Sequence, residues 1–202
     1  MVTNVIFLPD TYGLAVCGGN STRMGRDKSL LQYYDKPQRY HLYDMLLPFC
    51  KKAFISCNAE QAKNMEPGYL FLTDHTVYNN IGPMASLLTA FNKFPDKNIL
   101  LIGCDYPFLK SKDLNEFILF CNKKNKPVSF YNKQEDLYEP LLAWYPHHCF
   151  EELKRRFDKD QYSLQHFLKD NEACAFHPVN KKNIISVDTD EAYRNAFKTI
   201  NS

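Results

Sequence analysis

Apolar residues recur along this chain in two different patterns. At 42–49, 84–91 and 114–121 they occupy positions i, i+3, i+4 and i+7, the spacing that places side chains on one face of an α-helix. The second pattern is a set of short continuous runs rich in β-formers, at 14–17, 53–57, 69–72, 99–102 and 128–131. Buried parallel strands have this uninterrupted apolar character. Such strands, alternating with amphipathic helices, predict a mostly parallel sheet with helices on both faces.

The pattern changes after about residue 131. Residues 137–145 predict another strand, in which Pro140 marks a sheet edge or a bulge. Four shorter elements are expected after it: helices at 151–157 and 163–169, a late strand at 184–187 and a final helix at 191–198. The sequence has no repeat and no linker long enough to separate domains. We therefore predict a single α/β domain over 1–202, Rossmann-like and three-layered, with a small C-terminal lobe.

The composition is typical of a globular protein. Of 202 residues, 45% are hydrophobic and 24% are charged, and the net charge of +2 gives no reason to expect nucleic-acid binding. No apolar run approaches the ~20 residues that cross a bilayer, and the first residues lack the basic start of a signal peptide. The seven cysteines are an odd number and are expected to be reduced, buried thiols. We therefore expect a cytoplasmic location and no membrane contact.

A glycine-rich segment follows the first apolar strand. After 14–17 come Gly18 and Gly19, then short polar side chains, and then Arg23 and Lys28. Glycine lets the backbone approach an anion, exposed N–H groups form an anion-binding concavity, and the two cations add positive charge. The spacing fits neither the G-x-x-x-x-G-K-[ST] loop nor the G-x-G-x-x-G fingerprint. The segment suits a polyphosphate, and an ordinary glycine-rich turn with two solvated cations is the alternative.

The order of residues in this segment resembles a known signature. The string GG-x-S-T-R-M-G-x-D-K-S-L-L, from Gly18 to Leu31, is similar to the loop of nucleotidyltransferases. Within them it looks most like LAGG-x-S-x-R-M-G-x-D-K of the molybdenum cofactor guanylyltransferases, with Cys17 in the place of one small residue. The resemblance runs from residue 13 to about 193. It implies a nucleotidyltransferase fold, with a nucleotide-binding half at 12–131 and an acceptor-side lobe with the last strand and helix at 132–202.

The resemblance also implies a reaction. The terminal phosphate of molybdopterin attacks the α-phosphorus of GTP, pyrophosphate leaves, and the guanine dinucleotide form of the molybdenum cofactor results. Arg23 and Lys28 are then catalytic cations. Nucleotide contacts are implied for part of the loop, namely Val16, Cys17, Gly18, Gly19, Ser21, Arg23 and Lys28. Transient contacts with proteins that insert or accept the cofactor are a further implication.

Polar residues follow three of the predicted strands. Asp105 comes after 99–102 and precedes Tyr106-Pro107. A carboxylate at the carboxyl end of a parallel strand can hold Mg²⁺ against a phosphate, and in the resembled family the Asp of Asp-x-Pro binds metal. Asp105 is therefore predicted to be a catalytic residue, a metal ligand and a nucleotide contact. The resemblance implies nucleotide contacts for Asn58 and Asp74. Turns also favour Asn and Asp, which is the alternative for all three.

Two more positions match the family pattern less closely. Gly82 opens the segment GPMAS, where the family typically has GPLAG, and Ser86 takes the place of the second glycine. Gly82 is predicted to contact the nucleotide, and Ser86 leaves the base selectivity open. Asp188 lies in a loose match to N-[VI]-[ND]-T-P-E, which implies a second metal ligand. Its spacing to Glu191 is also that of a helix capping box, so a capping role is the alternative.

Other functions remain open at this stage. The same fold could use CTP with the same pterin, or a phosphosugar acceptor. A nucleotide-binding regulator without turnover is a hypothesis of another class, against which the intact Lys28 and Asp105 argue. Two kinds of site are excluded: His147-His148 is the only histidine cluster, so there is no zinc set, and no G-x-S-x-G elbow occurs.

Overall fold

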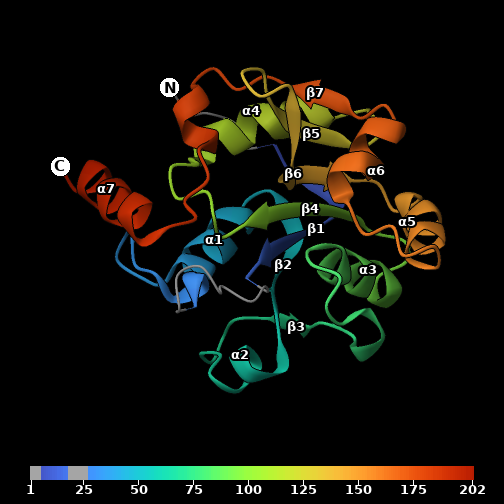
Figure 1. Cartoon of the computed structure of the whole chain (residues 1–202), viewed down its shortest axis with the longest axis horizontal. Coiled ribbons are helices and arrows are strands. Elements are labelled where there is room, and N and C mark those ends of the chain that lie inside the picture. The colour runs from blue at the N-terminus through green and yellow to red at the C-terminus, as the bar shows by residue number, and fades with distance from the viewer. Residues whose placement is uncertain (1–5, 18–26) are drawn as a thin grey trace.

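The computed structural model describes residues 6–17 and 27–202, and its strands form one seven-stranded sheet (Figure 1). The order across the sheet is β3-β2-β1-β4-β6-β5-β7. The strands are β1 (Leu8–Val16), β2 (Cys50–Cys57), β3 (Phe71–Thr73), β4 (Asn98–Gly103), β5 (Val128–Asn132), β6 (Leu137–Tyr145) and β7 (Cys174–Phe176). Neighbouring strands are parallel, except that β6 is antiparallel to both β4 and β5. The predicted mostly parallel sheet is confirmed.

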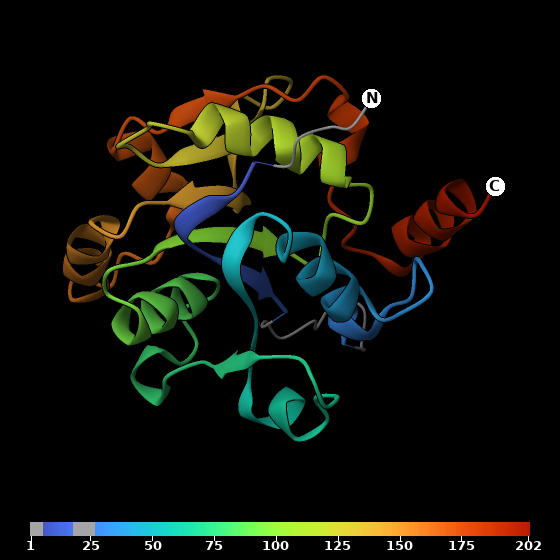
Figure 2. The same ribbon diagram turned by 180° about the vertical axis from the view of Figure 1, so that it is seen from behind.

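Helices cover both faces of this sheet, as the two opposite views show (Figure 1, Figure 2). The α-helices are α1 (Gln38–Leu46), α2 (Ala59–Lys63), α3 (Met84–Lys93), α4 (Ser111–Cys121), α5 (Cys149–Phe157), α6 (Leu164–Asp170) and α7 (Asp190–Ile200). Of these, α1 and α4 pack on one face of the sheet and α3, α5 and α6 on the other. Along β1, Ala15 and Cys17 pack on the side of α1 and α4. Leu14 and Val16 pack on the side of α3, α5 and α6. Residues 14–17 are all apolar because side chains on both faces of the sheet are covered here.

The strongly periodic elements are confirmed. The three segments with helical periodicity correspond to α1, α3 and α4. α1 ends at Leu46, and Phe49 lies buried in the turn that follows. The strand predicted at 137–145 has the bounds of β6. Two elements were not predicted, β7 and α2, because three and five residues are too few to show a period.

The late strand predicted at 184–187 is wrong. The 3-10 helix η3 (Lys181–Ile184) occupies its beginning, and the chain continues to α7 without a strand. Ile184 packs into the cluster under α1 and α4, whereas Val187 packs against Leu31 and Tyr33 in a separate cluster. These residues are apolar because each enters a different cluster, and not because they share a strand.

Pro140 lies at a bulge and not at an edge. β6 has β4 on one side and β5 on the other. The register between β5 and β6 shifts between Ser129 and Tyr131, opposite the stretch that contains Pro140. Because a bulge interrupts the ladder, it tolerates a residue that has no N–H to donate.

The sheet brings the carboxyl ends of β1, β2, β3 and β4 to one edge, since these four strands are parallel to one another. Open α/β sheets bind their ligands outside this edge. Within residues 6–17 and 27–202, no helix is long and apolar enough to cross a membrane.

Candidate active site

Lys28, Asp105 and Asp188 form a charged triad at this edge of the sheet. The Lys28 ammonium donates to Asp105 Oδ1 at 3.2 Å and to Asp188 Oδ1 at 2.9 Å. Asp105 follows β4, and its backbone carbonyl accepts a hydrogen bond from the N–H of Val187 at 2.8 Å. This bond holds the neighbouring Asp188 beside Asp105. Three segments that are far apart in the sequence therefore meet at one point.

Partial burial changes the proton affinities in the triad. Burial lowers the pKa of Lys28, but its hydrogen bond to Asp188 and the charges of both aspartates raise it, and the net shift is upward. Burial raises the pKa of Asp105, the charge of Lys28 lowers it and the charge of Asp188 raises it, and the net shift is again upward. Lys28 is therefore charged at neutral pH and compensates two neighbouring carboxylates.

The helix-cap alternative for Asp188 is wrong. The N-cap of α7 is Thr189, whose Oγ1 accepts a hydrogen bond from the N–H of Ala192 at 3.1 Å. Asp188 lies one residue earlier and faces Lys28. A threonine caps a helix well, so α7 does not need Asp188 as its cap.

The triad could hold a magnesium ion between its two carboxylates. Both Asp105 and Asp188 present an oxygen within 3.2 Å of the same ammonium nitrogen. Mg²⁺ prefers oxygen ligands and usually takes one or two carboxylates together with waters and substrate phosphates. In the part of the chain that the structure describes, no group of three or more His, Cys, Asp or Glu could hold a metal. The two carboxylates would suit a magnesium ion whose other ligands are waters and a substrate phosphate.

Gln61 links both ends of the segment 18–26. Its Nε2 donates to the carbonyl of Cys17 at 3.2 Å and to Asp27 Oδ2 at 2.9 Å. Asp27 in turn caps the 3-10 helix η1 (Lys28–Leu30) by accepting from the N–H of Ser29 at 2.9 Å. The sequence analysis missed Gln61, although the spacing Asn58 to Gln61 is that of a capping box, which the structure contains.

A pocket of about 560 Å³ lies at the same edge of the sheet, at the ends of β2 and β3. Asn58, Asp74, Gly82 and Ser86 are among the residues that line it. Asn58 also caps α2, since its Oδ1 accepts from the N–H groups of Glu60 and Gln61, so its side chain has a structural role. Gly82 has φ +66°, a conformation that side chains rarely adopt.

Asp74 is the half-buried carboxylate of this pocket. The Ser56 hydroxyl donates to its Oδ1 at 2.9 Å. Burial raises the pKa of Asp74, and the hydrogen bonds from the Ser56 and Ser86 hydroxyls lower it, with a net shift upward. Ser86, which departs from the glycine of the family pattern, thus supports the carboxylate that was predicted to contact the nucleotide.

The predicted loop residues divide into two groups. The side chain of Val16 is buried against the α3 side, and that of Cys17 lies 3.0 Å from the Cys104 sulfur. Only the backbone of Val16 could therefore reach a nucleotide. The remaining predicted loop contacts lie outside the described residues, namely Gly18, Gly19, Ser21 and Arg23.

Comparisons with known sequences identify a family. Residues 13–175 match the family described as the MobA-like NTP transferase domain. A molybdenum cofactor biosynthesis bifunctional protein of Synechocystis sp. is 31% identical over 135 residues, which cover 66% of this chain and 38% of that protein. A molybdenum cofactor guanylyltransferase of Shewanella loihica is 32% identical over 102 residues, which cover 50% of this chain and 52% of that protein. The matches thus span about half or less of the length of these two relatives.

A solved structure shares the fold. The molybdopterin-guanine dinucleotide biosynthesis protein A from Archaeoglobus fulgidus superposes with a TM-score of 0.78 and 19% identity, over 95% of this chain and 99% of that chain. At this identity the likeness concerns the fold. It confirms the predicted Rossmann-like nucleotidyltransferase architecture.

Proposed function

Because the chain belongs to the MobA-like NTP transferase family, we propose that it transfers GMP from GTP to the terminal phosphate of molybdopterin and releases pyrophosphate. The observation that carries the proposal is the charged triad of Lys28, Asp105 and Asp188, which lies at the same edge of the sheet as a pocket lined by the half-buried Asp74. The choice of substrates follows the relatives, a molybdenum cofactor guanylyltransferase and a molybdopterin-guanine dinucleotide biosynthesis protein.

The triad matches the charge that such a reaction develops. The attacking phosphate is already ionised, so no general base is needed, and catalysis depends on alignment and on neutralising charge. Lys28 would neutralise the triphosphate and the leaving pyrophosphate, together with Arg23, which lies outside the described residues. Asp105 and Asp188 would hold Mg²⁺, which when bound supplies positive charge to the phosphates.

The pocket supports guanine as the base. Guanine carries two adjacent N–H donors, and a carboxylate accepts from such a pair with its two oxygens. Asp74 is held by Ser56 and Ser86 at the inner wall of this pocket. Cytosine presents a single amino donor next to an acceptor, so a site built around a carboxylate would leave polar groups unpaired with CTP.

The acceptor is expected on the other side of the triad, in the half 132–202. The protein would work in the cytoplasm, where thiols stay reduced, and its seven cysteines are free. Contacts with proteins that insert the finished cofactor would be transient.

Nucleotide protection against heat tests the proposal. With Mg²⁺ present, GTP is expected to raise the melting temperature more than CTP or ATP, because a ligand at 100 times its Kd adds about 2.7 kcal/mol of stability. Equal protection by GTP and CTP would favour the cytidylyl alternative that Ser86 leaves open. Protection by GTP without pyrophosphate release in the presence of molybdopterin would favour the regulator.

A further inference from the structure

The ends of the strands place the candidate site residues in a spatial order along the sheet edge. Asp74 follows β3, Asn58 follows β2, Cys17 follows β1 and Asp105 follows β4. These strands lie next to one another across the sheet in the order β3, β2, β1 and β4 (Figure 1). The pocket of Asp74 therefore lies at one end of this row and the triad at the other. The next strand beyond β4 is β6.

β6 brings a further carboxylate to this edge. It is antiparallel to β4, and Ile102 pairs with Leu142. The residues that precede Leu142 therefore lie alongside the residues that follow Ile102. β6 approaches closely here, since a Cβ on Gly103 would lie 2.9 Å from the Cβ of Leu141. Glu139 consequently lies next to the segment of Asp105 that follows β4.

A direct hydrogen bond joins the two segments. The hydroxyl of Tyr106, the residue after Asp105, donates to Glu139 Oε2 at 2.7 Å. The Tyr106 side chain is buried, so it is a fixed donor. The backbone N–H of Glu139 donates to Ser129 Oγ at 3.1 Å, and the same hydroxyl donates to the Glu139 carbonyl at 2.9 Å. Glu139 is thus held in position by its side chain and by its backbone.

The Glu139 carboxylate is half-buried, and its described surroundings compensate it with neutral donors. Burial raises its pKa, the hydrogen bonds from Tyr106 and Asn132 lower it, and the charge of Glu135 raises it. None of these groups is a cation. A carboxylate has about four lone-pair positions, so after these bonds it can still accept from a ligand.

We propose that Glu139, positioned by Tyr106, binds the acceptor molecule by accepting hydrogen bonds from its uncharged N–H or O–H donors. This inference rests on the proposed function. A carboxylate repels a phosphate, so the acceptor's phosphate faces Lys28 and the rest of the molecule extends toward β6. The ring N–H and amino group of a pterin are adjacent donors that match the two oxygens of one carboxylate, and sugar hydroxyls share this chemistry.

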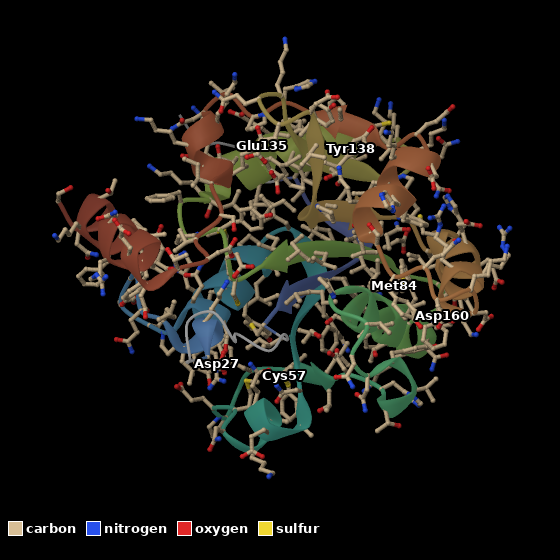
Figure 3. The ribbon with its side chains drawn as sticks, in the orientation of Figure 1. Asp27, Cys57, Met84, Glu135, Tyr138 and Asp160 are labelled. Carbon is tan, nitrogen blue, oxygen red and sulfur yellow. The ribbon has the colours of Figure 1, made fainter. Side chains whose placement is uncertain are left out.

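The test compares Glu139→Gln with Glu135→Gln. The first variant keeps the size of the side chain and turns one acceptor oxygen into a donor. The second changes an exposed glutamate in the connection between β5 and β6, which Figure 3 labels. Pyrophosphate release gives KM for GTP and for the acceptor, with molybdopterin in one arm and glucose 1-phosphate in the other. We expect E139Q to raise KM for the acceptor about tenfold, as a lost bond to a charged group does.

The expected pattern is specific. KM for GTP stays unchanged in E139Q, both constants stay unchanged in E135Q, and Tyr106→Phe raises KM for the acceptor less than E139Q does. The acceptor that the parent turns over, and whose KM rises in E139Q, shows whether the donors belong to a pterin or to a sugar. The inference would be overturned if E139Q had the same KM for the acceptor as the parent. It would also be overturned if E139Q raised KM for GTP and KM for the acceptor equally and had a lower melting temperature.

Failure of the proposed function would be visible separately. If the parent released no pyrophosphate with either acceptor, binding of molybdopterin would be followed by its pterin fluorescence. The inference is upheld if the parent and E135Q bind molybdopterin with equal affinity and E139Q binds it about tenfold more weakly, the size expected for a lost hydrogen bond to a charged group. Equal binding by all three proteins, or none by the parent, overturns it.

Discussion

At the scale of single residues, the site depends on one ammonium group shared between two carboxylates. The sequence predicted Lys28 from the loop motif and Asp105 from its place after a strand. It left Asp188 ambiguous, because the spacing to Glu191 imitates a capping box. Thr189 caps the helix instead, and only the folded chain brings Asp188 within 2.9 Å of Lys28. Such a long-range contact leaves no local signal.

Asp188→Asn should weaken the response to Mg²⁺ and leave the fold intact. The amide keeps the shape of the side chain and removes a charge from the proposed ligand set. Higher Mg²⁺ concentrations should be needed for half-maximal pyrophosphate release, with little change in the melting temperature. Thr189→Ala is the matched control: it should cost about 1 kcal/mol of stability through the lost cap and keep the parent's Mg²⁺ dependence. If Asp188→Asn needed the same Mg²⁺ concentration as the parent for half-maximal pyrophosphate release, Asp188 would not be a metal ligand.

Ser86→Ala should shift the pH dependence of nucleotide binding. The variant removes a hydroxyl that lowers the pKa of Asp74, so the pKa should rise further above its unfolded value. GTP affinity should then be lost at a higher pH during acidification, because binding needs the ionised carboxylate. Because the pKa of Asp74 is raised in the folded state, the folded protein binds more protons than the unfolded chain at pH values between the two pKa values. The free energy of unfolding therefore falls as the pH rises from the unfolded to the folded pKa, and this fall should be larger in Ser86→Ala. Superimposable pH profiles of GTP affinity would contradict the role given to Ser86.

At the scale of elements, periodic segments could be predicted and short or irregular ones could not. α1, α3 and α4 each present an apolar face over at least two turns, and their burial followed from the pattern. The apolar residues 184–187 imitate a strand although they enter two different clusters. α2 has five residues and no buried face, so only its cap signal was available. The hydrogen bonds of its Gln61 to Cys17 and Asp27 became visible only in the tertiary structure.

Gln61→Ala should weaken GTP binding through the loop ends that this side chain joins. Gln61 donates to Cys17 and Asp27, on either side of residues 18–26, and losing such a bond typically costs about 1 kcal/mol, roughly fivefold in affinity. Isothermal titration with GTP and Mg²⁺ measures the effect. Lys63→Ala is the control, because Lys63 lies on the same helix and pairs with the exposed Glu60. Equal GTP affinities in the two variants would show that Gln61 does not organise the site.

At the scale of the whole molecule, the direction of the strands arranges the site. Four parallel strands bring the pocket of Asp74, Cys17 at the end of β1, and the triad to one edge, in the strand order β3, β2, β1 and β4. The reversal at β6 then adds residues from the second half of the chain to the same edge. Under the proposed function, a single sheet would thereby place the two substrates side by side, which is the proximity that a transfer between them requires.

Pyrophosphate release by the parent and by Lys28→Ala, with GTP, molybdopterin and Mg²⁺, tests the central claim most directly. Lys28 lies between Asp105 and Asp188, and one preorganised charge contact to a transition state contributes on the order of 3 kcal/mol, about a hundredfold in rate. We predict GTP-dependent release by the parent and a loss of about that size in the variant, with both proteins folded by circular dichroism. Release at the parent's rate by Lys28→Ala would contradict the account.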